Sequence, residues 1–124
     1  MSSKGADWLT VEYDGFEILV GRNARANDRL TLRLARPRDL WLHAAGYAGS
    51  HVVIRLPAGV DDVPRPVIER AAELAAWHSK AREARGKVSV HLTRAGDVRK
   101  RRGAPPGQVQ LRKFETVRVY PRGE

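Results

Sequence analysis

Hydrophobic and polar residues alternate along the start of the chain. Apolar side chains occupy every second position from 9 to 13, and the alternation resumes from 16 to 20. A period of two is typical of strands that bury one face. Asp14 and Gly15 lie between the two stretches, and an Asp-Gly pair favours a two-residue hairpin turn. The pattern therefore predicts a β-hairpin that ends at Gly21.

The next segment fits either a strand or a helix. Three leucines stand at alternate positions, as in a strand, but Leu30 and Leu34 also share one side of a helix. A polar residue ahead of them, Asn27 or Asp28, suits a helix N-cap. Pro37 would end such a helix, because the residue before a proline avoids helical angles. We predict a short helix here.

Further along, four stretches have the composition of strands: residues 39–45, 50–57, 87–93 and 114–121. The segment 66–86 is the clearest helix, since its apolar residues recur at helical spacing. Pro66 suits the first helical position and Gly86 suits the C-terminal cap. The basic segment before the last strand is expected to be a loop or ribbon.

These elements predict an α+β fold in a single domain. The sheet is expected to be mostly antiparallel and to carry one long helix and one short helix. A chain of 124 residues suits one domain with one core. We place the domain at residues 8–120, between a short N-terminal tail at 1–7 and a C-terminal tail at 121–124.

Composition excludes several classes of protein. No apolar run approaches the roughly 18–20 residues needed to span a bilayer, and the N-terminus lacks the apolar stretch of a signal peptide. The chain has no cysteine, which rules out disulfides, thiolate catalysis and cysteine-ligated zinc. We therefore expect a cytoplasmic protein with no membrane partner, no metal and no cofactor.

Charge is the strongest global signal. The formal net charge is +9, and between residues 94 and 113 seven basic residues against one aspartate give seven minus one, or +6. Such an excess favours polyanions, with nucleic acid first and anionic membrane second. A solvated face that only aids solubility is the alternative. We predict that Arg99, Lys100, Arg101 and Arg102 contact phosphates.

The stretch "DLWLHAAGYAGSH" gathers an acid, an indole and two imidazoles. Strand alternation places Asp39, Trp41 and His43 on one face, and Leu40 and Leu42 on the opposite, core-facing side. An aromatic ring beside basic groups is suited to single-stranded or looped RNA, because every base has a face that can stack. Alternatively, Trp41 packs in the core and Asp39 holds His43 or a loop amide.

Four more side chains could reach the same ligand. Arg22 and Asn23 follow the end of the hairpin, where a guanidinium and an amide can hold a phosphate and a base edge or ribose hydroxyl. Ser50 and His51 follow a glycine that lets the backbone approach a ligand. Asn23 could instead cap the short helix. Lys80 near the end of the long helix is a further candidate, with an ordinary surface position as the alternative.

Several stretches also resemble one known family. They are "VGRNARANDRLT", "DLWLH", "GSHVVIR", "AAELAAWHSKAR" and "VRKRRGAPPGQV". Together they resemble the NFACT-R domain, the RNA-binding part of the NFACT proteins of ribosome-associated quality control, over about residues 8–120. The family's N-terminal domain, helix-hairpin-helix and coiled coil, which select a tRNA and elongate nascent tails, have no counterpart here. The resemblance implies a stand-alone RNA-binding module.

The sequence therefore favours a non-catalytic module that binds tRNA or ribosomal RNA, with the large ribosomal subunit as a further candidate partner. One alternative is an RNA-processing or RNA-modification enzyme, or its accessory subunit, that uses Asp39, His43 and His51. Another is an adaptor that docks on a partner protein, and the oligomeric state stays open. The predicted RNA contacts are Arg22, Asn23, Asp39, Trp41, His43, Ser50, His51, Lys80, Arg99, Lys100, Arg101 and Arg102.

Overall fold

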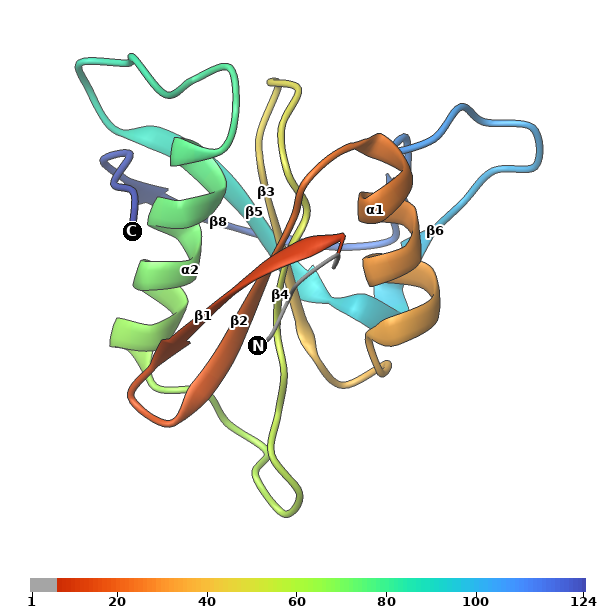
Figure 1. The fold of residues 1–124 in the computed structure, drawn as a ribbon, viewed down its shortest axis with the longest axis horizontal. Helices are drawn as coiled ribbons and strands as arrows, with labels where there is room; N and C mark the ends of the chain where they lie inside the picture. Colours follow the sequence, from red (N-terminus) through yellow and green to blue (C-terminus); the bar gives the residue numbers. More distant parts are fainter. Residues whose placement is uncertain (1–6) are drawn as a thin grey trace.

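A six-stranded antiparallel sheet forms the centre of the molecule in the computed structural model, which describes residues 7–124 (Figure 1). Its strands, in spatial order, are β1 (Trp8–Tyr13), β2 (Phe16–Gly21), β4 (Val52–Ile54), β3 (Leu40–Ala44), β5 (Val88–Arg94) and β8 (Glu115–Val119). A separate two-stranded ribbon contains β6 (Val98–Arg99) and β7 (Gln110–Leu111). The helices are α1 (Ala24–Arg29), which continues into a π-helical segment η1 (Leu30–Leu34), α2 (Arg65–Trp77) and a short 3-10 helix η2 (Ala95–Asp97).

The predicted hairpin is confirmed. Tyr13 pairs with Phe16 at the end of β1 and β2, and the two residues between them form the turn. Asp14 and Gly15 have φ angles of 52° and 86°. Both angles are left-handed, as the favoured two-residue hairpin turn requires.

The sheet is covered on both faces. Leu40 and Leu42 point into the core beneath α2, as strand alternation predicts. Trp41 points the other way, into a second apolar cluster beneath η1 and the β6–β7 ribbon. This second cluster contains Leu19, Leu30, Trp41, Val53 and Val98. Figure 1 shows α2 on one side of the sheet and α1 with the ribbon on the other.

The short helix begins earlier than predicted. Its N-cap is Asn23, whose side-chain oxygen accepts a hydrogen bond of 2.8 Å from the amide of Ala26. Asn27 is not a cap, because it lies buried within the helix. Its side chain instead accepts from the amide of His51 (3.0 Å) and donates to the carbonyl of Gly49 (3.3 Å). Asn27 therefore joins α1 to the segment that enters β4.

The long helix ends at Trp77, nine residues before the predicted cap at Gly86. The reason is a competing set of backbone hydrogen bonds beyond Trp77. The carbonyl of His78 accepts from the amide of Ser50, and the amide of Lys80 donates to the carbonyl of Ala48, both at 2.9 Å. These groups can no longer extend the helical ladder, so tertiary pairing overrides a strong local preference for helix.

This crossing also explains the glycine at position 49. Gly49 and Ser79 form an isolated β-bridge. A Cβ atom on Gly49 would lie 2.5 Å from the Cβ of Ser79, which is closer than side chains tolerate. A residue without a side chain is therefore needed where the two backbones meet.

Residues 121–124, predicted as a C-terminal tail, form neither helix nor strand and contact α2. Arg70 on α2 donates to the carbonyls of Arg122 (3.1 Å) and Gly123 (2.7 Å), so this segment lies along the helix. Of the N-terminal tail predicted at 1–7, all but Asp7 lies outside the described residues. The carboxylate of Asp7 pairs with Arg29. Within residues 7–124 no helix has the length and apolar character required to cross a membrane.

Candidate nucleic-acid interface

A cleft of about 1170 Å³ lies between the sheet, the start of α1, the turn after α2 and the loop between β6 and β7. Three cationic side chains line it: Arg22, Lys80 and Arg82. No carboxylate from the described part of the chain is among its lining residues. A concave surface that holds cations without compensating acids concentrates a positive potential and attracts anions.

Aromatic rings form part of the cleft lining. His43 and His91 face each other across β3 and β5, and both line the cleft. The ring of Phe114 lies 4.1 Å from that of His91, measured between centroids, and its side chain is left largely accessible, with a relative exposure of 51%. His43 in turn stacks on the buried indole of Trp41 at 5.9 Å. The cleft thus presents ring surfaces beside cations.

A directed chain of hydrogen bonds runs beneath these rings. The Nε1 of Trp41 donates to the hydroxyl of Thr31 at 3.0 Å. That hydroxyl lies 2.8 Å from Nδ1 of His51, whose Nε2 is 3.1 Å from the carbonyl oxygen of Gly107. Because a carbonyl only accepts, Nε2 carries the proton and Nδ1 accepts from Thr31. His51 therefore links the sheet to the β6–β7 loop as a neutral imidazole.

Burial keeps His51 neutral. Desolvation, followed by the nearby charge of protonated His43, lowers the pKa of His51 to about 4. Desolvation also lowers the pKa of His43 and that of His91, and in His43 the neighbouring His91 adds to the effect. Adding a proton to His51 would place a charge in a buried site and remove the acceptor that Thr31 needs.

Stability is therefore expected to fall as pH drops below the ordinary histidine value of 6.5. The unfolded chain binds a proton at His51 that the folded chain rejects, so the folded state loses about 2 kcal/mol between pH 7.5 and 5. Urea unfolding at the two pH values measures this loss. A His51→Gln variant should lose correspondingly less over the same range. An equal pH dependence in both proteins would contradict the assignment.

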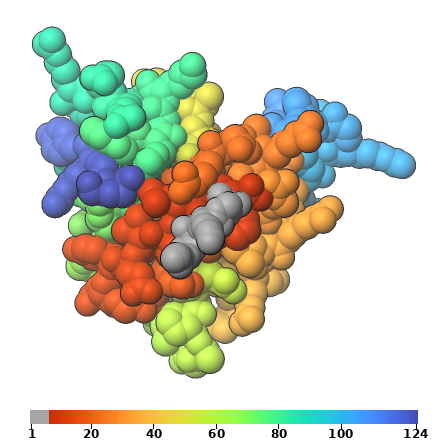
Figure 2. Space-filling model, in the orientation of Figure 1, coloured from red at the N-terminus to blue at the C-terminus, as the bar shows by residue number. Residues whose placement is uncertain are grey.

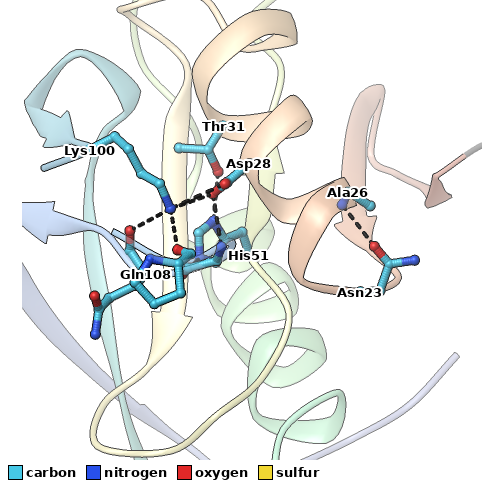
Figure 3. Close-up of polar contacts among 9 residues, drawn as sticks. Asn23, Ala26, Asp28, Thr31, His51, Lys100 and Gln108 are labelled. Atoms are coloured by element: carbon cyan, nitrogen blue, oxygen red, sulfur yellow. Dashed lines mark hydrogen bonds and ion pairs between the residues drawn. The ribbon is translucent and has the colours of Figure 1, made fainter. Parts of the chain in front are cut away.

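A second tether holds the β6–β7 loop on α1 (Figure 3). The carboxylate of Asp28 accepts from the amide of Gly107 at 3.0 Å and pairs with the ammonium of Lys100 at 3.1 Å. The same ammonium donates to the carbonyl of Gln108 at 3.0 Å and to that of Pro105. The prediction for Lys100 is corrected accordingly. Its ammonium is engaged by Asp28 and by two backbone carbonyls, so it stabilises the loop and is not free to bind a phosphate.

The other three cations of the predicted ribbon are differently placed. Arg99, Arg101 and Arg102 are exposed, and within residues 7–124 none of them forms a salt bridge. Figure 2 shows the loop that follows β6 projecting from the body beside α1. The same loop contributes Pro106 and Gly107 to the wall of the cleft, so the loop and the cleft adjoin.

Two predicted contacts are buried. Asp39 is 2% exposed, and its carboxylate accepts from the amides of Arg36 (2.9 Å) and Leu56 (3.0 Å). Trp41 is 1% exposed and belongs to the second core. The Asp39 carboxylate thus organises the backbone, which corrects its prediction as a ligand contact. Trp41 is among the residues that line the cleft, stacked with His43, and its contact with RNA stays a prediction. Strand alternation correctly separated Trp41 from Leu40 and Leu42, but the face that bears Trp41 is covered by η1 and the β6–β7 ribbon.

The remaining predicted residues line the cleft. Arg22, Asn23 and Lys80 are exposed there, and His43 is half-buried. Ser50 also lines it, with its hydroxyl donated to the carbonyl of Gly21. His51 lines it too but is buried, and both its ring nitrogens are engaged. The structure thus brings together predicted residues from four separate segments.

The lining residues that were not predicted include Arg82, His91 and Phe114. The guanidinium of Arg82 lies 4.0 Å from the centroid of the Trp77 ring, an arrangement that holds this cation at the cleft. His91 and Phe114 complete the aromatic surface. Phe114 did carry a signal, since it is a lone aromatic directly after the cations of the basic segment.

Six arginines lie between residues 22 and 38, and of these only Arg22 was predicted as an RNA contact. Only Asp28 opposes them, so this segment carries six minus one, or +5. All six are exposed, and those on α1 and η1 recur every four residues along one side. They are Arg22, Arg25, Arg29, Arg33, Arg36 and Arg38. Because α1 contacts the β6–β7 loop through Asp28, the two basic segments are neighbours.

Comparison with known proteins identifies the family. The profile described as "NFACT protein RNA binding domain" matches residues 7–113. The chain belongs to this family. Both the resemblance to the NFACT-R domain and the predicted α+β class are thus confirmed.

Relatives of this NFACT RNA-binding domain are much longer proteins. The "Rqc2 homolog RqcH" of Bacillus subtilis is 42% identical over 86% of the chain, which spans 18% of that protein. The "Ribosome quality control complex subunit NEMF homolog" of Drosophila melanogaster is 28% identical over 79% of the chain and is covered for 10% of its length. The chain therefore spans less than a fifth of either relative.

A solved structure shares the fold. It is the C-terminal part of the fibronectin/fibrinogen-binding protein from Streptococcus suis, with a TM-score of 0.83 and 41% identity. The match covers 91% of this chain and 44% of that one. The NFACT RNA-binding domain described here is thus similar to a solved relative in both architecture and sequence.

Proposed function

We propose that this NFACT RNA-binding domain holds tRNA or ribosomal RNA without chemically altering it. The observation that carries the proposal is the cleft whose cations, Arg22, Lys80 and Arg82, meet no carboxylate among the described lining residues. RNA phosphates would contact these cations and the arginines of the adjoining loop. The name of the Drosophila relative, a homolog of a ribosome quality control complex subunit, supports ribosome quality control as the setting. We place this activity in the cytoplasm.

The electrostatic part of the binding should dominate its strength. Each phosphate that a cation neutralises releases counterions, so log affinity falls with log salt by about 0.7 per contact on single strands. Side chains that meet bases or ribose hydroxyls would add orientation and discrimination. Asn23 and Gln108 are polar, exposed and line the cleft, and we propose that they make such contacts.

Catalysis by the predicted acid and histidines is disfavoured. The Asp39 carboxylate accepts from two backbone amides. His51 donates one ring proton to a carbonyl and accepts a hydroxyl proton at the other nitrogen, which leaves no free lone pair for a general base. Of these three predicted residues only His43 keeps access to the cleft, and the described lining residues include no carboxylate that could act with it as an acid–base pair. A binding role fits this arrangement better.

The double substitution Arg22→Ala with Lys80→Ala tests the proposal. With a slope of about 0.7 per contact, each phosphate contact adds about 0.7 log unit of affinity at 0.1 M salt relative to 1 M salt. Losing two contacts should therefore weaken tRNA binding at 0.1 M salt by about 25-fold. Fluorescence anisotropy with labelled tRNA measures the dissociation constant. The matched control is Arg65→Ala with Lys87→Ala, two exposed cations that do not line the cleft. Equal losses in both proteins, or no tRNA binding by the wild type at low salt, would overturn the proposal.

A further inference from the structure

The aromatic lining of the cleft points to the form of RNA that it accepts. We propose that the cleft receives a segment of unpaired nucleotides, with at least one base stacked on Phe114. This inference rests on the proposed function, because it concerns which RNA occupies the same cleft. It goes beyond that function by assigning a stacking platform and by excluding paired RNA from the cleft.

Phe114 is an unusual residue for its position. It directly follows two cations and precedes β8. About half of its surface is accessible to solvent, although burying an apolar ring lowers the free energy. The ring is not loose, since it lies against the imidazole of His91 at 4.1 Å with a tilt of 40°. A supported ring that is exposed within a cationic cleft matches the way proteins hold bases by stacking.

An unpaired base can use such a platform, whereas a base inside a duplex cannot. In a duplex the faces of the bases are covered by their neighbours in the stack, and the phosphates lie outside. Side chains therefore meet paired RNA at its backbone and its shallow minor groove. Unstacked bases of loops, bulges and single strands can instead enter a cleft and lie on an aromatic ring.

The size of the cleft favours a polymer segment over a lone nucleotide. Its volume of about 1170 Å³ exceeds the range of roughly 300–1,000 Å³ that is usual for small-molecule pockets. Its cations come from two segments that are far apart in the sequence. Arg22 precedes α1, and Lys80 and Arg82 follow α2. Three cations in one cleft of this volume can hold more than one phosphate, as a polymer segment would supply.

Competition against labelled tRNA tests the inference. Unlabelled hexauridylate, which has no pairing, is expected to displace the tRNA. A longer blunt hairpin, almost entirely paired and closed by a minimal tetraloop, is compared at the same total concentration of phosphates and is expected to compete at least tenfold less well. If the hairpin competes as well as hexauridylate while tRNA still binds, the inference is wrong and the proposed function stands. If tRNA itself does not bind, the proposed function fails.

Substitution of Phe114 tests the platform separately. Phe114→Ala should weaken direct hexauridylate binding about tenfold, as expected for one lost base stack. Phe114→Tyr keeps a ring and should bind like the wild type, which separates stacking from a disturbed fold. The matched control is Tyr120→Ala, a comparably exposed aromatic that does not line the cleft. Unchanged binding by Phe114→Ala, or equal losses in Phe114→Ala and Phe114→Tyr, would overturn the assignment.

Discussion

Replacing Arg99, Arg101 and Arg102 together by glutamate is expected to weaken tRNA binding at 0.1 M salt by about 100-fold or more. Three phosphate contacts of about 0.7 log unit each account for that loss, and the repulsion between the new carboxylates and RNA adds to it. The three arginines are exposed and free of salt bridges within residues 7–124. Their removal should therefore cost the fold little.

A salt titration of the dissociation constant measures the effect. The slope of log affinity against log salt should become shallower by about 2 in the triple variant. The charge-matched control reverses Arg85, Arg118 and Arg122, which are exposed, form no salt bridge within residues 7–124 and lie outside both the loop and the cleft. The loop has no special role if the control loses as much affinity as the triple variant. Lys100 is left unchanged in this experiment, because its reversal would also break the tether to Asp28.

The substitution Thr31→Val is expected to destabilise the fold by about 2–4 kcal/mol. Valine has nearly the shape of threonine, but it leaves the indole N–H of Trp41 and the Nδ1 of His51 without their shared partner. Both residues are almost completely buried, and each unsatisfied buried polar group costs about 1–3 kcal/mol. The side chain is small, yet it links η1, the sheet and His51.

Chemical unfolding followed by tryptophan fluorescence measures the change in the free energy of unfolding. Thr10→Val on the exposed side of β1 is the matched control and should stay within about 0.5 kcal/mol of the wild type. A Thr31→Val protein as stable as that control would show that the hydrogen-bond chain contributes nothing. The His51→Gln variant then gives an independent reading of the same chain.

The strands and the faces of their side chains could be predicted well, because they depend on the local sequence pattern. Alternation identified the hairpin, the core-facing leucines and the opposite face that bears Trp41 and His43. It could not reveal what covers that second face, since the cover comes from η1 and from a ribbon much later in the chain. The same limit applied to Asp39, whose backbone partners include Leu56, 17 positions away.

The basic segment shows a different limit. Its charge correctly marks a cationic surface, but charge alone does not tell which cations are already engaged. Lys100 pairs with Asp28, 72 positions earlier, so no local pattern distinguishes it from Arg99 or Arg101. Likewise the helix was expected to reach residue 86, because its alanine-rich and charged sequence favours helix throughout. Pairing with residues 48–50 ended it at Trp77.

The two tethers of the β6–β7 loop have a consequence for how fast a ligand is captured. His51 and the Asp28–Lys100 pair both hold the segment around Gly107, so its conformational freedom is given up during folding. An incoming strand meets a template that is already shaped and needs to order only itself. Capture should then be governed by encounter and long-range attraction, with no slow rearrangement of the protein behind it.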